Sequence, residues 1–167
     1  ITLDGSSGTP PPLSVSGGRI NIKWADYDAQ VSPFLNGLVF SAGEPLYGAK
    51  TTSVTLHPPP SLNESGQQIQ YWREVARHFR QKGWLDRLFI YLWDEPNPSQ
   101  YAALTTIGQT IRRADPALRN LVTAPLHPEW RDFVDIWTPT INCLERKPPH
   151  DDYCHPVVDR AGYTPEL

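Results

Sequence analysis

Two adjacent carboxylates, Asp94 and Glu95, follow the most apolar run of the chain, "LFIYLW" at residues 88–93. A carboxylic acid in partly apolar surroundings has a raised pKa, and a neighbouring negative charge raises that pKa further. Such a group can protonate a leaving glycosidic oxygen near neutral pH. The pair is therefore a candidate catalytic pair; the alternative interpretation is a polar strand end followed by a loop cap.

The alternation of a β-strand predicts which face each residue of this run occupies. Leu88, Ile90 and Leu92 share one face, which we expect helices to cover. The other face, directed toward the mouth of a barrel, carries Phe89, Tyr91, Trp93 and Glu95. Asp94 then points away from Glu95 if the strand stays regular. Both acids can reach one ligand only if the strand end twists or bulges, and Pro96 favours such a distortion.

Adjacent acids do not fit the usual mechanism of glycoside hydrolysis. That mechanism places two carboxylates on opposite sides of the sugar, about 5 to 5.5 Å apart for retention or about 6.5 to 9.5 Å apart for inversion. Either a nucleophile comes from another strand, or the substrate supplies its own. A third alternative is a carbohydrate-binding or structural barrel without catalysis.

Aromatic and polar residues at predicted strand ends complete the candidate site. Tyr91 and Trp93 share the face of Glu95, His57 ends a short strand before three prolines, and Trp137 ends a later strand. We predict that these four bind substrate; the alternative is that the aromatic rings belong to the core and that His57 is hydrogen-bonded within its loop. Asp26 and Asp28 lack a third carboxylate at useful spacing, so we predict a solvated helix start there, with no metal and no cofactor.

Strands and helices alternate along the chain, which is typical of a parallel α/β sheet. Residues 1–18 are rich in Gly, Ser and Pro and predict a linker or loop. A strand with Ile20 and Ile22 follows, then a helix that we expect Pro33 to break or shorten. Ser61 and Glu64 have the spacing of a capping box before the next helix.

The predicted elements are too few for a closed barrel. A (β/α)8 barrel needs about 250 residues, and the chain has 167. No glycine-rich dinucleotide-binding or phosphate-binding loop follows a predicted strand. We therefore predict a partial (β/α)8 TIM-type barrel over residues 19–145 and an irregular segment over 146–167. The remainder of the barrel is predicted to be missing from this chain.

Composition excludes several partners. The chain has a net charge of -3, with 39% hydrophobic and 20% charged residues. These values describe a globular protein without the basic surface that nucleic acids require. No apolar run approaches the roughly 20 residues that span a bilayer. Cys143 and Cys154 are compatible with a disulfide, with two free thiols or, together with His150 and His155, with zinc. The compartment stays open, with an extracellular or envelope location favoured.

Five blocks of the chain carry a family resemblance. The segments "KWADYDAQVSPFLNG", "TSVTLHPPP", "GWLDRLFIYLWDEP", "QTIRRADPALRNLVTAP" and "FVDIWTPTINCL" resemble the catalytic domain of glycoside hydrolase family 123 and its bacterial relatives of unknown function. The resemblance implies a (β/α)8 barrel and a retaining β-N-acetylgalactosaminidase, in which the 2-acetamido group of the substrate attacks the anomeric carbon. It implies Glu95 as the acid/base and Asp94 as the residue that orients this group. A glycan or glycoside is then the expected substrate, and the particular sugar is left open.

Overall fold

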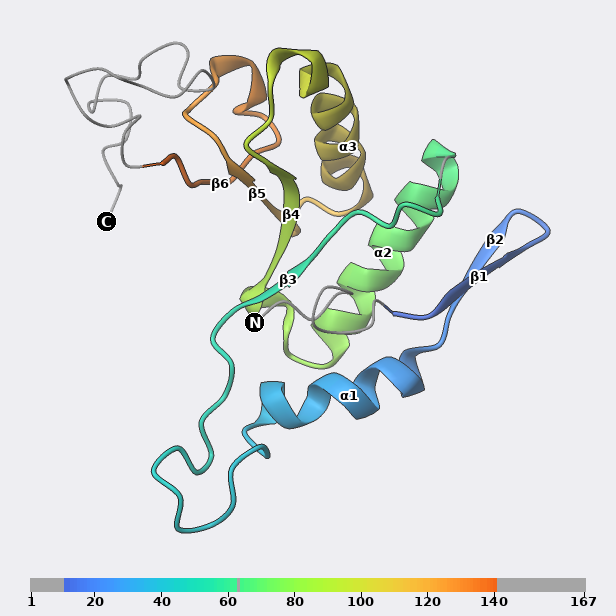
Figure 1. Ribbon diagram of the computed structural model, residues 1–167. Coiled ribbons are helices and arrows are strands. Elements are labelled where there is room, and N and C mark those ends of the chain that lie inside the picture. The colour runs from blue at the N-terminus through green and yellow to red at the C-terminus, as the bar shows by residue number, and fades with distance from the viewer. Residues whose placement is uncertain (1–10, 63, 141–167) are drawn as a thin grey trace.

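The computed structural model describes residues 11–62 and 64–140 of the chain (Figure 1). Cys143, Cys154 and the segment predicted to be irregular lie outside these residues. The strands are β1 (Leu13–Ser16), β2 (Arg19–Ile22), β3 (Val54–Leu56), β4 (Leu88–Asp94), β5 (Arg119–Thr123) and β6 (Ile136–Trp137). The α-helices are α1 (Trp24–Asn36), α2 (Ser65–Gln81) and α3 (Tyr101–Ala114). Three short 3-10 turns are η1 (Leu85–Arg87), η2 (Pro98–Gln100) and η3 (Pro128–Trp130).

The main sheet has four parallel strands in the order β3-β4-β5-β6. The order of the strands in space is their order along the chain, and α2 and α3 lie side by side on one face of the sheet (Figure 1). The predicted α/β class with parallel strands is therefore confirmed. The expected helix-facing residues of β4 are also confirmed, because Leu88, Ile90 and Leu92 are only 1%, 0% and 5% exposed.

The segment that precedes α1 differs from the prediction. Leu13–Ser16 pairs antiparallel with Arg19–Ile22, so part of the expected linker is a strand, and this hairpin forms a sheet separate from the main one. Gly17 and Gly18 both have positive φ, 54° and 75°. A two-residue hairpin turn whose twist matches its strands requires this backbone. The Gly-Gly pair between two alternating segments was the missed hairpin signal.

Helix α1 is neither broken nor short, contrary to the expectation from Pro33. The helix runs for 13 residues through Pro33 and ends at Gly37, which adopts a left-handed φ of 76°. Proline removes the hydrogen bond to the carbonyl of Ala29, four residues earlier. Because Ala29 is exposed, water can replace this bond, whereas continuation of the helix buries Leu35 completely. The free energy gained by burying Leu35 therefore outweighs the cost of one lost backbone hydrogen bond.

Asp28 is not the solvated residue that the sequence predicted. Its Oδ1 lies 2.7 Å from Nε2 of His78, and its Oδ2 lies 2.6 Å from Nζ of Lys82. The His78 ring also stacks on Trp24, with ring centroids 3.8 Å apart. These contacts dock α1 onto the C-terminal half of α2.

The predicted capping box lies at the wrong helix. Helix α2 begins at Ser65, and its N-cap residue Glu64 makes no side-chain cap hydrogen bond. The capping box of the described chain is instead formed by Asn97 and Gln100, at the turn η2 that leads into α3. This turn fixes the path of the chain directly after the acidic pair.

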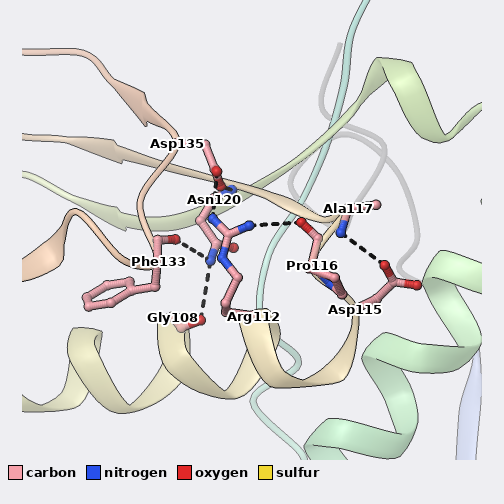
Figure 2. Close-up of polar contacts among 8 residues, drawn as sticks. All are labelled: Gly108, Arg112, Asp115, Pro116, Ala117, Asn120, Phe133 and Asp135. Carbon is pink, nitrogen blue, oxygen red and sulfur yellow. Dashed lines mark hydrogen bonds and ion pairs between the residues drawn. The ribbon is translucent and has the colours of Figure 1, made fainter.

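Close packing and buried hydrogen bonds hold α3 against β5 (Figure 2). Asn120, which is completely buried, donates from its side-chain nitrogen to the carbonyl oxygens of Gly108 and Phe133, at 3.3 and 2.7 Å. Arg112 donates to the carbonyl of Pro116 at 2.8 Å and also pairs with Asp135. The network therefore joins α3 to the chain directly after the helix and to the chain that leads into β6.

We predict that Gly108→Ala destabilises the protein by about 1 to 3 kcal/mol, because overpacking a filled core forces side chains and backbone to shift. A Cβ atom at this position would lie 2.2 Å from a ring carbon of Phe133. Urea unfolding measures the change. Gly66→Ala is the matched control, since a Cβ there meets nothing within 4 Å. We expect this control to keep stability or raise it by up to about 1 kcal/mol. Equal effects of the two substitutions would contradict the packing argument.

Candidate functional site

A β-bulge near the end of β4 changes the face on which its last residues lie. In the pairing with β5 the register runs Tyr91 with Leu121, then Trp93 with Val122, then Asp94 with Thr123. Leu92 is the extra residue. A bulge of this kind leaves one residue unpaired and reverses the alternation beyond it. The distortion that the sequence analysis required is therefore present, and it precedes both acids.

Asp94 lies on the same side of β4 as Tyr91. Its Oδ1 accepts a hydrogen bond from the Tyr91 hydroxyl at 2.7 Å and from the Thr123 hydroxyl at 2.9 Å. In a regular strand, residues three apart point to opposite faces, so the hydrogen bond from Tyr91 depends on the bulge. Asp94 is exposed and is not packed beneath the helices.

Glu95 follows the strand in a left-handed backbone conformation with φ 46°, the one positive φ of a non-glycine residue in the described chain. Such a conformation is unfavourable for a residue with a Cβ and is typically found at functional sites. The backbone N–H of Glu95 donates to Thr123 Oγ at 2.7 Å. The residue is exposed, so the described residues do not provide the apolar surroundings that the sequence analysis expected.

Tyr91 and His57 lie beside the acidic pair. The ring of His57, directly after β3, meets the Tyr91 ring edge to face, with centroids 5.2 Å apart and an interplanar angle of 73°. Burial raises the pKa of Tyr91, and the hydrogen bond to Asp94, the negative charge of Asp94 and the charge of Glu95 also raise it. A side-chain hydrogen bond with Thr123 acts in the opposite direction and lowers this pKa. Burial lowers the pKa of His57, which favours the neutral imidazole. Tyr91 is thus a neutral hydrogen-bond donor between two carboxylates and a neutral histidine.

The structure does not bring Trp93 and Trp137 to this group. Trp93 pairs with the buried Val122 and packs against the hydrophobic core, so its predicted face is wrong because the bulge precedes it. Trp137 also pairs with Val122, and it stacks on Trp130 with ring centroids 6.2 Å apart. Of the six predicted site residues, Asp94, Glu95, Tyr91 and His57 gather at the carboxyl ends of β3 and β4, where parallel sheets build their sites.

Thr123 is the residue of this group that the sequence analysis missed. It ends β5 and contacts the backbone of Glu95 and the side chain of Asp94. The signal available in the sequence was a hydroxyl residue at the carboxyl end of an apolar strand in "NLVTAP". That signal alone did not distinguish Thr123 from an ordinary strand residue.

A separate hollow of about 210 Å³ lies on the side of the helices. It is lined by Pro58, Pro59, Pro60, Leu62, Gln68, Trp72 and Ile107, and none of the predicted catalytic residues contributes to it. Within residues 11–62 and 64–140, no three histidine, cysteine or acidic residues cluster as metal ligands would. No helix in the same ranges is long and apolar enough to cross a bilayer.

No protein-family model matches this chain, and no curated protein sequence matches it.

We predict that Asp94→Asn lowers the pKa of Tyr91 toward its ordinary value of about 10. The substitution removes the negative charge that opposes ionisation of the phenol. At a pH of about 10 the phenolate fraction of Tyr91, measured by ring-carbon NMR with assignment from Tyr91→Phe, should rise above that of the unsubstituted protein. Glu95→Gln is the comparison. It should raise the fraction less, because Glu95 acts on the phenol through its charge, whereas Asp94 also accepts the hydrogen bond from the phenol. A larger effect of Glu95→Gln would contradict this geometry.

Proposed function

We propose that this chain is part of a (β/α) barrel glycoside hydrolase that cleaves β-linked N-acetylhexosamine, of the GalNAc type, by substrate-assisted retention. The observation that carries the proposal is the bulge at Leu92, which brings Asp94 to the face of Tyr91 with Glu95 as the next residue. Two adjacent acids at the carboxyl end of a parallel strand suit a reaction in which they serve different atoms of one sugar. The proposal also rests on the five sequence blocks that resemble glycoside hydrolase family 123.

The connectivity of the main sheet supports the barrel. Its strands follow one another in chain order. Such an order, with both crossover helices on one face, is the arrangement from which (β/α) barrels are built. A doubly wound sheet instead reverses its strand order and carries helices on both faces. In a barrel, the face of Tyr91 would be the interior and the carboxyl ends of the strands would form the mouth.

In the proposed mechanism, the two acids act on different groups of the substrate, the glycosidic oxygen and the 2-acetamido group. The Glu95 carboxylic acid gives its proton to the glycosidic oxygen as the bond from this oxygen to the anomeric carbon breaks. The acetamido carbonyl oxygen of the substrate forms a new bond to the same carbon, while Asp94 accepts a hydrogen bond from the acetamido N–H. Glu95, now a carboxylate, then takes a proton from water. The water oxygen attacks the anomeric carbon and breaks the bond to the acetamido oxygen. Two inversions give net retention.

The hydrogen bond from the Tyr91 hydroxyl suits Asp94 to its proposed role, which is to orient the acetamido group of the substrate. Hydrogen bonds from Tyr91 and Thr123 hold Oδ1 of the Asp94 carboxylate in place. Its other oxygen can accept a hydrogen bond from the acetamido N–H, which increases the electron density on the acetamido oxygen that attacks. His57 and Tyr91 place two aromatic rings in contact beside the acids, and such rings can pack against an apolar face of a sugar.

We predict that Glu95→Gln, introduced into the full-length protein with the complete barrel, lowers kcat for phenyl 2-acetamido-2-deoxy-β-glycosides roughly 10² to 10⁴-fold, because general-acid catalysis contributes that much. Asp94→Asn should lower kcat by roughly 10² to 10³-fold through loss of electrostatic stabilisation. The matched controls are Glu64→Gln and Asp132→Asn, which make the same chemical changes at exposed acids outside the pair, and they should leave kcat unchanged. Equal rates in the protein and in both site variants would exclude catalysis by this pair.

A thiazoline inhibitor that mimics the cyclised acetamido group separates the two hydrolytic mechanisms. Strong competitive inhibition, together with no hydrolysis of matching glycosides that carry a 2-hydroxyl group, is the expected result. If both glycosides are cleaved and the thiazoline has no effect, a carboxylate from another strand is the nucleophile, and the substrate-assisted proposal is wrong.

A further inference from the structure

Thr123 lies at the centre of the hydrogen bonds that connect the two acids. Its Oγ is 2.7 Å from the backbone nitrogen of Glu95 and 2.9 Å from Oδ1 of Asp94. A hydroxyl group donates one proton and accepts through its lone pairs. The N–H of Glu95 therefore donates to Thr123 Oγ, and the hydroxyl proton remains for one acceptor.

Asp94 is the better of the two acceptors within reach of this proton. Oδ1 of Asp94 lies at 2.9 Å, whereas the carbonyl oxygen of Trp93 lies at 3.3 Å. A carboxylate also forms the stronger hydrogen bond. The Tyr91 hydroxyl, 3.4 Å from Thr123 but 2.7 Å from Asp94, donates to the same carboxylate oxygen. The hydrogen bonds thus run from the Glu95 amide to Thr123 and from Thr123 to Asp94, and bonds connected in this way strengthen one another.

The backbone of Glu95 depends on this arrangement. Its left-handed φ of 46° directs the N–H toward β5, and Thr123 Oγ is the acceptor at that position. One side chain on the neighbouring strand β5 therefore holds both the backbone of Glu95 and the carboxylate of Asp94. Oδ1 of Asp94 is occupied by Tyr91 and Thr123, so Oδ2 is the oxygen left to accept a hydrogen bond from a ligand.

We propose that Thr123 is a positioning residue for the acidic pair: its hydroxyl sets the turn at Glu95 and selects the oxygen of Asp94 that faces the substrate. This inference rests on the proposed function for its effect on the reaction. Its effect on the backbone of Glu95 is independent of any activity. The test therefore has two readouts.

The first readout is the dependence of hydrolysis on the leaving group. Thr123→Val keeps the shape of the side chain and removes its hydroxyl, whereas Thr123→Ser keeps the hydroxyl. We expect Thr123→Val to lower kcat roughly 10- to 100-fold for a phenyl glycoside, because misplaced catalytic groups have effects of this size. The fall should be much smaller for a dinitrophenyl glycoside, whose departure needs little protonation. Thr123→Ser should restore most of the rate.

A matched control comes from the neighbouring strand β3. Thr55 is buried, and its hydroxyl has no hydrogen-bond partner among the described residues. Thr55→Val makes the same chemical change away from the acids, so it should leave kcat unchanged for both glycosides. A merely structural effect of Thr123→Val would lower both rates by the same factor and would overturn the proposal.

The second readout is hydrogen exchange at the Glu95 amide, measured by NMR. Loss of the acceptor in Thr123→Val should speed this exchange about five- to tenfold, as expected for one lost hydrogen bond. Thr123→Ser and Thr55→Val should not speed it. Unchanged exchange in Thr123→Val would overturn the positioning role even if the rate falls. Inactivity of the complete barrel that contains this chain, with exchange that behaves as expected, would refute the proposed function and leave the backbone role of Thr123 supported.

Discussion

The candidate site depends on one extra residue in a parallel pair of strands. Without the bulge at Leu92, the alternation of β4 would direct Asp94 toward α2 and α3, where an unpaired charge costs several kcal/mol. With the bulge, Leu92 and Trp93 both contribute to the core and Asp94 reaches the opposite face. The insertion thus removes a charge from the apolar layer and places it beside Tyr91. Core packing and site geometry are set by the same irregularity.

The bulge can position side chains only because the strands beside it are held firmly. Phe133 fills the space left by the missing side chain of Gly108, and Asn120 bridges α3 to the segment after β5. These contacts fix β5, and β5 carries Thr123 to the end of β4. On the other side, α1 is fastened to α2 through Asp28, His78 and Lys82. The helices packed on one face of the sheet therefore hold the strands whose ends carry the polar groups.

Hydrophobic periodicity correctly predicted features that depend on residues close in the sequence. It failed for features that depend on contacts between distant residues. The buried face of β4 up to Leu92 and the alternation of strands and helices followed from apolar spacing. The need for a distortion near the acids was inferred from the chemistry of the pair, but its position was not, since no glycine in "YLWDEP" signals a bulge. The face assigned to Trp93 was consequently wrong. Thr123 was missed because its partners lie 28 and 29 residues away, across a strand pairing that the sequence does not specify.

The left-handed backbone conformation of Glu95 bears on the proposed role of its side chain. A left-handed conformation costs on the order of 1 to 2 kcal/mol for a residue with a Cβ, whereas one amide-to-hydroxyl hydrogen bond contributes about 1 kcal/mol. The bond to Thr123 therefore roughly offsets the strain and leaves little net gain in stability. Glycine would adopt the same φ without strain, and asparagine with less, yet the position carries an exposed glutamate. An exposed glutamate in a strained turn beside a second carboxylate is what the proposed role of an acid that serves a bound ligand leads us to expect.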